Sequence, residues 1–114
     1  MYLAVWEFEV RRGREAQFAR LYGPEGEWVR LFRRAAGYLE TRVAGRGRRF
    51  ITVDCWRSRA AYLSFRRRFA ARHAALDRRG EVLTVRETPL HEATAPGAAF
   101  RLAATRARAR GSSA

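Results

Sequence analysis

Alternating apolar and polar positions predict four β-strands along the chain. Residues 1–10 alternate so that one face stays apolar throughout, and residues 38–44, 49–56 and 81–87 follow the same two-residue period. The stretch 45–48, Gly-Arg-Gly-Arg, lies between the second and third strands and has the composition of a tight turn. The second and third strands therefore form a predicted hairpin.

Apolar positions spaced three and four residues apart predict the helices that connect these strands. Residues 14–36 show this spacing on both sides of an interruption at 23–26, so we expect two helical pieces or one broken helix. A longer helix is expected over 59–79, with Ser58 as its N-cap and Gly80 at its end. The order β-α-β-β-α-β predicts a ferredoxin-like α+β fold: a four-stranded antiparallel sheet with the helices on one face.

The parity of the strand residues predicts which face the helices cover. We expect the helix-facing set to be Leu39, Val43, Ile51, Val53, Cys55, Leu83 and Val85. The opposite set is then Tyr38, Glu40, Arg42, Phe50, Thr52, Asp54, Trp56, Thr84 and Arg86. Such a face is too aromatic for water and too charged for the core of a monomer, so we expect a homodimer that pairs through the sheets. Asp54 and Arg42 are expected to pair across the sheet or the dimer interface.

Composition changes at Pro89. The 114 residues fit one domain, and their hydrophobic content of 47% is enough for a core. Residues 1–88 are assigned to this domain. Residues 89–114 are rich in Ala, Arg, Gly and Ser, and we predict a basic, disordered tail there.

The charge balance is strongly basic. The chain has 24 arginines, no lysine and 11 acidic residues, for a formal net charge of +13. Arg66–Arg68 give the long helix a basic face, but no known nucleic-acid-binding motif accompanies it, so a solvated face is the preferred interpretation and nucleic acid is not an expected partner. No apolar run is long enough to span a membrane, and one cysteine permits no internal disulfide, so we expect a cytoplasmic protein without membrane contact.

One stretch resembles a known family. In residues 50–62 an apolar strand ends in Trp56, Ser58 starts a helix, and an aromatic residue follows within that helix, as in the antibiotic biosynthesis monooxygenase (ABM) family. The Gly37-Tyr38-Leu39 segment is also similar. The resemblance covers residues 1–88 and implies a dimeric α+β barrel. This superfamily includes cofactor-free oxygenases, haem-degrading enzymes and isomerases.

The residue sets of two branches of the superfamily are incomplete here. Cofactor-free members place an Asn and a Tyr beside the Trp of this strand, and haem-degrading members have an Asn on the first strand and an axial His on the long helix. This chain has no Asn. Trp6 stands at the first-strand position of that Asn, and Arg66 stands roughly where the axial His would fall.

The candidate site combines the resemblance with the residue pattern. The candidate catalytic residues are Trp56, Tyr62 and His73, with His73 a possible general base or haem ligand. The candidate substrate-binding residues are Trp6, Trp28, Phe32 and Phe65, which would line an aromatic pocket, and Arg86, which would hold an anion. For the helical aromatic residues and for His73, ordinary packing is the preferred alternative. No metal site is expected, because two histidines and one cysteine are too few.

Three functions follow, in order. The first is a cofactor-independent monooxygenase that acts on a polycyclic phenol or quinone-type small molecule. The second is a non-catalytic dimeric module that binds an aromatic small molecule or haem. The third is a basic protein associated with nucleic acid.

Overall fold

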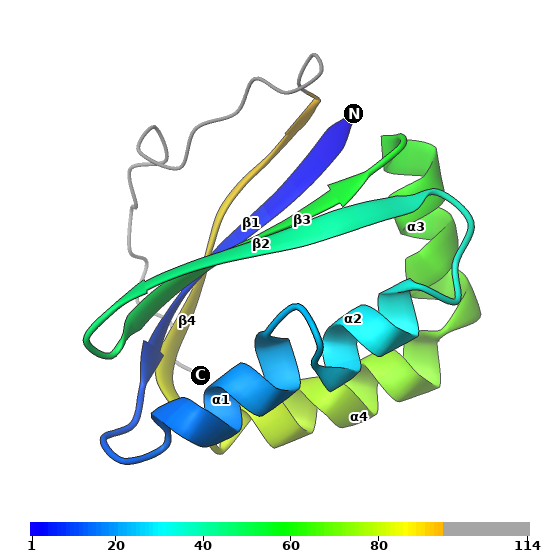
Figure 1. Cartoon of the computed structure of the whole chain (residues 1–114). Helices are drawn as coiled ribbons and strands as arrows, with labels where there is room; N and C mark the ends of the chain where they lie inside the picture. The colour runs from blue at the N-terminus through cyan, green and yellow to red at the C-terminus, as the bar shows by residue number, and fades with distance from the viewer. Residues whose placement is uncertain (95–114) are drawn as a thin grey trace.

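The computed structural model describes the backbone of residues 1–94 and the side chains of residues 1–90. Its elements in chain order are β1 (Tyr2–Val10), α1 (Glu15–Tyr22), α2 (Glu27–Phe32), β2 (Tyr38–Arg46), β3 (Arg49–Trp56), α3 (Arg59–Arg68), α4 (Ala70–Glu81) and β4 (Thr84–Thr94). The strands form one antiparallel sheet in the order β2-β3-β1-β4, and the four helices cover one face of it (Figure 1). The predicted ferredoxin-like α+β fold is therefore confirmed.

The helices differ from the prediction in one place. The expected interruption near Gly23 is confirmed, because α1 ends at Tyr22 and α2 begins at Glu27. Ser58 caps α3 as predicted, and its Oγ accepts a hydrogen bond from the Ala61 N–H at 3.1 Å. The single helix expected over 59–79 is instead two helices, α3 and α4, because the backbone at Phe69 leaves helical geometry with φ −113° and ψ 29°.

The fourth strand is longer than predicted and starts later. α4 continues one residue past Gly80, so β4 begins at Thr84, and it runs through Pro89 to Thr94. Pro89 is tolerated because β4 is an edge strand that pairs only with β1, beside a register shift between Val5 and Trp6. Part of the segment predicted to be a tail is thus a strand, and the rest of that prediction, residues 95–114, lies outside the described residues.

The predicted assignment of faces for β3 is wrong. Phe50, Thr52, Asp54 and Trp56 face the helices, whereas Ile51, Val53 and Cys55 face away from them. The physical reason is side-chain volume. The helices stand off the sheet, and large aromatic rings of β1 and β3 fill the space between them, while smaller β-branched side chains and Cys55 suffice on the other face.

Outside β3 the face predictions have mixed outcomes. Leu83 lies in the core beneath the helices, and Val43 is opposite Thr52 on the helix side, both as predicted. Leu39 and Val85 are instead exposed, and each lies at a register irregularity of an edge strand. Such irregularities change which way a side chain points, and parity alone does not predict them.

A second apolar cluster lies on the face of the sheet that the helices leave uncovered. Leu3, Val5, Val53 and Cys55 are buried there. Met1, Ile51 and Leu90 are partly buried and pack against them. No helix among the described residues is both long and apolar enough to cross a membrane.

Candidate functional site

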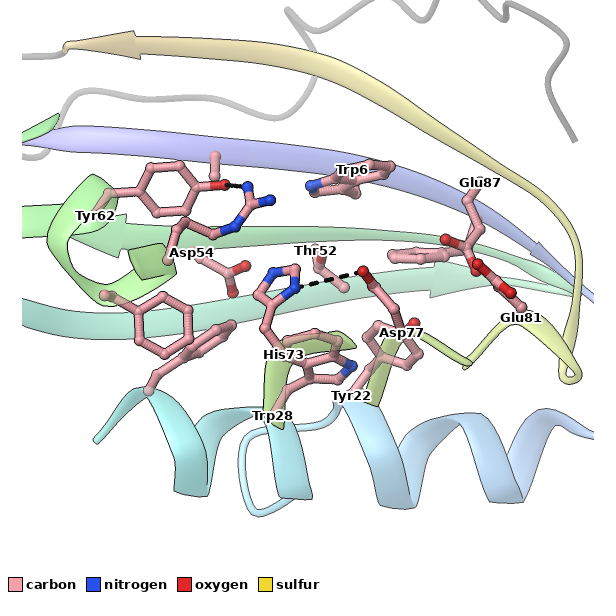
Figure 2. A pocket seen from close by; sticks show the side chains of 15 residues that line it. Trp6, Tyr22, Trp28, Thr52, Asp54, Tyr62, His73, Asp77, Glu81 and Glu87 are labelled. Carbon is pink, nitrogen blue, oxygen red and sulfur yellow. Dashed lines mark hydrogen bonds and ion pairs between the residues drawn. The ribbon is translucent and has the colours of Figure 1, made fainter. Parts of the chain in front are cut away.

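A cavity of about 310 Å³ lies between the helices and the sheet. Fifteen residues from β1, β3, β4 and all four helices line it: Ala4, Trp6, Phe8, Tyr22, Trp28, Phe32, Thr52, Asp54, Tyr62, Phe65, Arg66, His73, Asp77, Glu81 and Glu87 (Figure 2). Its volume is at the small end of the range for small-molecule sites.

Seven of the fifteen residues that line the cavity are Phe, Tyr or Trp. The Tyr22 ring contacts the Phe8 ring at a centroid distance of 4.7 Å and the Trp28 ring at 6.1 Å. Phe32 continues this series, at 5.7 Å from Trp28 and 5.3 Å from Phe65. Rings that pack on one another in this way hold each other in place. This part of the wall is therefore formed by aromatic residues of α1, α2 and α3 facing those of β1.

Six of the eight residues singled out from the sequence line this cavity. They are Trp6, Trp28, Phe32, Tyr62, Phe65 and His73. The other two do not. Trp56 is fully buried behind the wall, where it contacts Tyr62 and Phe65, and its indole N–H has no hydrogen-bond partner among the described residues. Arg86 is exposed and lies opposite Glu9 on the face without helices, so it is not placed to hold an anion in the cavity.

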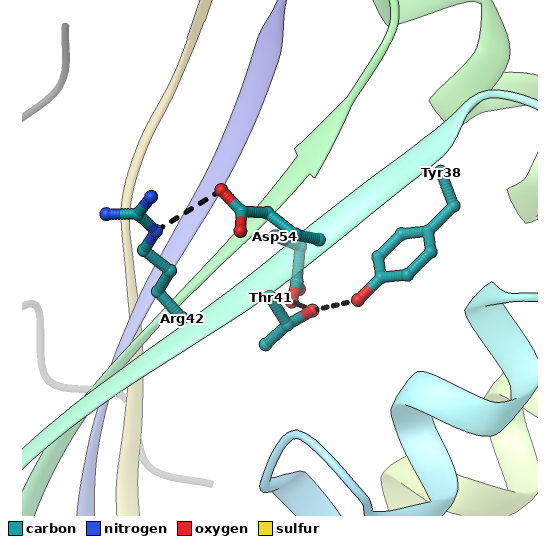
Figure 3. Close-up of polar contacts among 5 residues, drawn as sticks. Tyr38, Thr41, Arg42 and Asp54 are labelled. Atoms are coloured by element: carbon teal, nitrogen blue, oxygen red, sulfur yellow. Dashed lines mark hydrogen bonds and ion pairs between the residues drawn. The ribbon is translucent and has the colours of Figure 1, made fainter. Parts of the chain in front are cut away.

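Asp54 was expected on the face of the sheet away from the helices, but it lines the cavity. Its Oδ1 accepts a hydrogen bond of 2.8 Å from the Thr41 hydroxyl, which also lies 2.7 Å from the Tyr38 hydroxyl (Figure 3). Burial raises the pKa of Asp54 to about 7, against the lowering effect of the Thr41 hydrogen bond. A carboxyl group that titrates near neutral pH in a cavity is suited to accept a proton from a bound molecule.

Asp54 and Arg42 lie on opposite faces of the sheet, so the expected pairing across the sheet is wrong. Arg42 lies opposite Val53 on the face without helices, and its Nε is 3.2 Å from the Glu40 carboxylate. Asp54 lies on the helix side of the same sheet. The sequence contains one indication that Asp54 faces the helices. Asp54 shares its parity with Phe50 and Trp56, whose large rings pack in the core beneath the helices.

His73 lies in the middle of the cavity wall. Its Nδ1 is 3.4 Å from the Asp77 carboxylate one turn further along α4, and its ring packs edge-on against Trp28 with a centroid distance of 4.9 Å (Figure 2). The His73 side chain is 19% exposed. His73 is thus a packing residue, which the sequence analysis preferred. It is also a polar group that a ligand in the cavity would meet.

The end of the cavity next to β4 is acidic. Glu81 and Glu87 lie there, with Asp77 between them and His73 (Figure 2). Burial raises the pKa of Glu87, and the negative charges of Asp77 and Glu81 add to this, against a hydrogen bond of 3.0 Å from the Thr84 hydroxyl. Burial and the charge of Glu87 also raise the pKa of Tyr22.

The cavity does not have the geometry of a metal centre. Among the described residues, no three His, Cys, Asp or Glu side chains gather closely enough to hold a metal ion. Cys55 is buried on the other face of the sheet, and burial raises the pKa of its thiol to about 11.

Comparisons with known proteins establish the fold. No protein-family model and no curated protein matches the chain. Among solved structures, an uncharacterized NIPSNAP domain protein from Burkholderia xenovorans is similar, with a TM-score of 0.62 and 13% identity over 89% of this chain and 100% of that one. A NIPSNAP family protein from Agrobacterium tumefaciens gives a TM-score of 0.57 and 16% identity over 85% and 94%.

At these identities the likeness concerns architecture and not activity. The two NIPSNAP structures support the ferredoxin-like α+β fold that the ABM resemblance implied. Membership of the ABM family itself stays a prediction.

Proposed function

We propose that this protein binds a flat aromatic small molecule in the cavity between its helices and its sheet. The observation that carries the proposal is the cavity itself, about 310 Å³ in volume and lined in part by aromatic rings that contact one another. A flat ring system can pack against such rings with little rearrangement, because the wall is already assembled. The few polar groups in the wall, among them Thr52, Asp54 and His73, would set the orientation of the ligand.

Calorimetric titration with 1-naphthalenemethanol, a neutral two-ring probe, tests this proposal. Ala4 lines the cavity from β1, so Ala4→Leu adds apolar volume inside it and should weaken binding by about tenfold or more. Ala44→Leu is the matched control, because Ala44 is exposed opposite Ile51 on the face without helices. Equal binding by both variants would place the probe elsewhere and contradict the proposal.

A second candidate function is cofactor-free monooxygenation, which Asp54 favours. An ABM-like reaction begins by removing a proton from the substrate, and Asp54 is a cavity carboxyl group with a pKa of about 7. With anthrone as the test substrate, one O₂ is consumed and anthraquinone and water are formed. Oxygen uptake that depends on anthrone and falls at least tenfold in Asp54→Asn supports this function. Uptake that is absent, or equal in the variant, contradicts it.

We also propose that two copies pair through the face of the sheet without helices. The partly buried Met1, Ile51 and Leu90 are the apolar side chains that a second copy could cover, and they pack on the buried cluster of Leu3, Val5, Val53 and Cys55. The charged residues Glu40 and Arg42 lie beside the cluster on β2, as the polar rim of an interface would. This places the interface on smaller apolar side chains and not on the aromatic face first expected.

A further inference from the structure

The distribution of charge in the cavity is opposite to that of the whole chain. The chain has 24 arginines and 11 acidic residues. Among the described side chains, a single arginine, Arg66, lines the cavity, whereas four acidic residues do: Asp54, Asp77, Glu81 and Glu87. A random selection from so basic a chain would favour arginine, so the acidic wall is a specific property of this site.

Neither Arg66 nor His73 pairs with Asp54 or Glu87. Arg66 donates a hydrogen bond of 3.1 Å to the Tyr62 hydroxyl, and its guanidinium lies 5.8 Å from the centre of that ring. His73 is next to Asp77. Asp54 accepts a hydrogen bond from the Thr41 hydroxyl, and Glu87 accepts one from the Thr84 hydroxyl. Among the described residues, neither carboxyl group has a cationic partner.

Two carboxyl groups in a partly dehydrated cavity, neither of them paired with a cation among the described residues, favour the binding of a positive charge. The raised pKa of Asp54 and of Glu87 expresses the same preference, because each group holds its proton more tightly than it would in water. A positively charged ligand would satisfy it. The aromatic rings beside these carboxylates attract cations too, since the face of a ring is negative.

The arrangement suits an organic cation better than a metal ion. Asp54 lies toward the Tyr62 end of the cavity, and Glu81 and Glu87 lie at the other end (Figure 2). The acidic groups are thus spread along the wall, and no three of the described metal-binding side chains converge. An extended molecule can meet rings along its body and a carboxylate at its charged end.

We propose that the ligand of this cavity is an alkylamine that carries an aromatic ring system and is protonated at neutral pH. This inference rests on the proposed function, namely that the cavity binds an aromatic small molecule, and it adds the charge of that molecule. Aromatic anions such as phenolates and carboxylates should be excluded by the same groups. That exclusion runs against the long-range field of a chain with net charge +13, which attracts anions to its surface.

Three probes with the same ring system test the inference: 1-naphthylmethylammonium, 1-naphthalenemethanol and 1-naphthoate, which are cationic, neutral and anionic. Calorimetry at about 0.15 M salt limits non-specific attraction of the anion to the arginine surface. The expected order is cation, then neutral probe, then anion, with about tenfold between the first two. Glu87→Gln and Asp54→Asn should each reduce that ratio.

Glu40→Gln is the matched control, because Glu40 is exposed on the face without helices and should leave the ratio unchanged. If all three probes bind equally, or the anion binds best, the inference is wrong while the proposed binding function stands. A cation preference that survives in both Glu87→Gln and Asp54→Asn also overturns it. If none of the three binds, the proposed function fails and the inference fails with it.

Discussion

Asp54 illustrates how one buried residue can decide the properties of a site. Its carboxyl group lies in an aromatic cavity and has Thr41 as its hydrogen-bond donor. Its pKa is raised from 3.8 to about 7 because burial penalises the charged form. The other charged or titratable side chains that line the same cavity include Arg66, His73, Asp77, Glu81 and Glu87.

The raised pKa of Asp54 predicts how stability depends on pH. Between 3.8 and about 7 the folded chain binds a proton at Asp54 that the unfolded chain has released. The stabilisation is fully present below this window and is lost as the pH rises through it. We therefore expect urea unfolding of the wild type to show a higher free energy at about pH 5 than at about pH 8, with Asp54 contributing on the order of a few kcal/mol.

Asp54→Asn is the test of this assignment, because an amide does not titrate. The difference in unfolding free energy between the two pH values should shrink in Asp54→Asn by the contribution of Asp54. An unchanged difference would show that other groups cause the pH dependence.

At the scale of elements, α1 and α4 approach each other closely where Gly80 of α4 faces Tyr22 of α1. A side chain at Gly80 on α4 would overlap the hydroxyl oxygen of Tyr22 on α1, and its Cβ would lie 3.1 Å from the Tyr22 Cζ atom. Tyr22 packs against Phe8 and Phe18, so a side chain at Gly80 could be admitted only if the Tyr22 ring gave up part of this packing. Glycine is therefore required here for close approach of the two helices.

Gly80→Ala should lower the free energy of unfolding by about 1–3 kcal/mol, because the methyl group overpacks this contact. Adding Tyr22→Phe removes the hydroxyl that the methyl group meets, so the double variant should regain part of the loss. Denaturant unfolding of the wild type, both single variants and the double variant gives the coupling energy. If the two effects are simply additive, the contact does not limit the packing of α1 on α4.

The elements also show how far the sequence could be interpreted. Periodicity predicted the order of strands and helices along the chain and the ferredoxin-like fold, because each segment has one dominant period and clear turn residues. It misassigned the faces of β3, because both faces of that strand carry apolar residues and parity alone cannot choose between them. Ring size was the missing criterion. Trp6 and Phe8 on β1 share their face with Phe50 and Trp56, the partners of the helical aromatics.

The candidate site was predicted in part for the same reason. The aromatic wall follows from helical spacing, so Trp28, Phe32, Tyr62 and Phe65 were found. The acidic groups depend on which way β3 and β4 face and on where α4 ends, and these details come from tertiary packing. Sequence reasoning therefore predicted an aromatic pocket and missed its charge.

At the scale of the whole molecule, the sheet has one face beneath four helices and one apolar cluster without them (Figure 1). Pairing of two copies through that cluster predicts a mass in solution of twice 13.1 kDa. Ile51→Asp should shift light scattering toward the monomer, because Ile51 flanks the cluster and is partly buried. Val82→Asp is the control, since Val82 is 66% exposed and lies outside the sheet.

A wild type with the mass of a single chain at micromolar concentrations would contradict the pairing. Equal dissociation by Ile51→Asp and Val82→Asp would show that the interface lies elsewhere.

The central claim is that the cavity binds an aromatic small molecule, and the three tryptophans offer the most direct measurement. Trp6 and Trp28 line the cavity, and Trp56 is buried behind its wall. Their indole N–H signals can be followed by two-dimensional ¹H–¹⁵N NMR during titration with 1-naphthalenemethanol. The account predicts saturable shifts that are largest for Trp6 and Trp28 and smaller for Trp56. A titration that leaves the signals of Trp6 and Trp28 in place would contradict it.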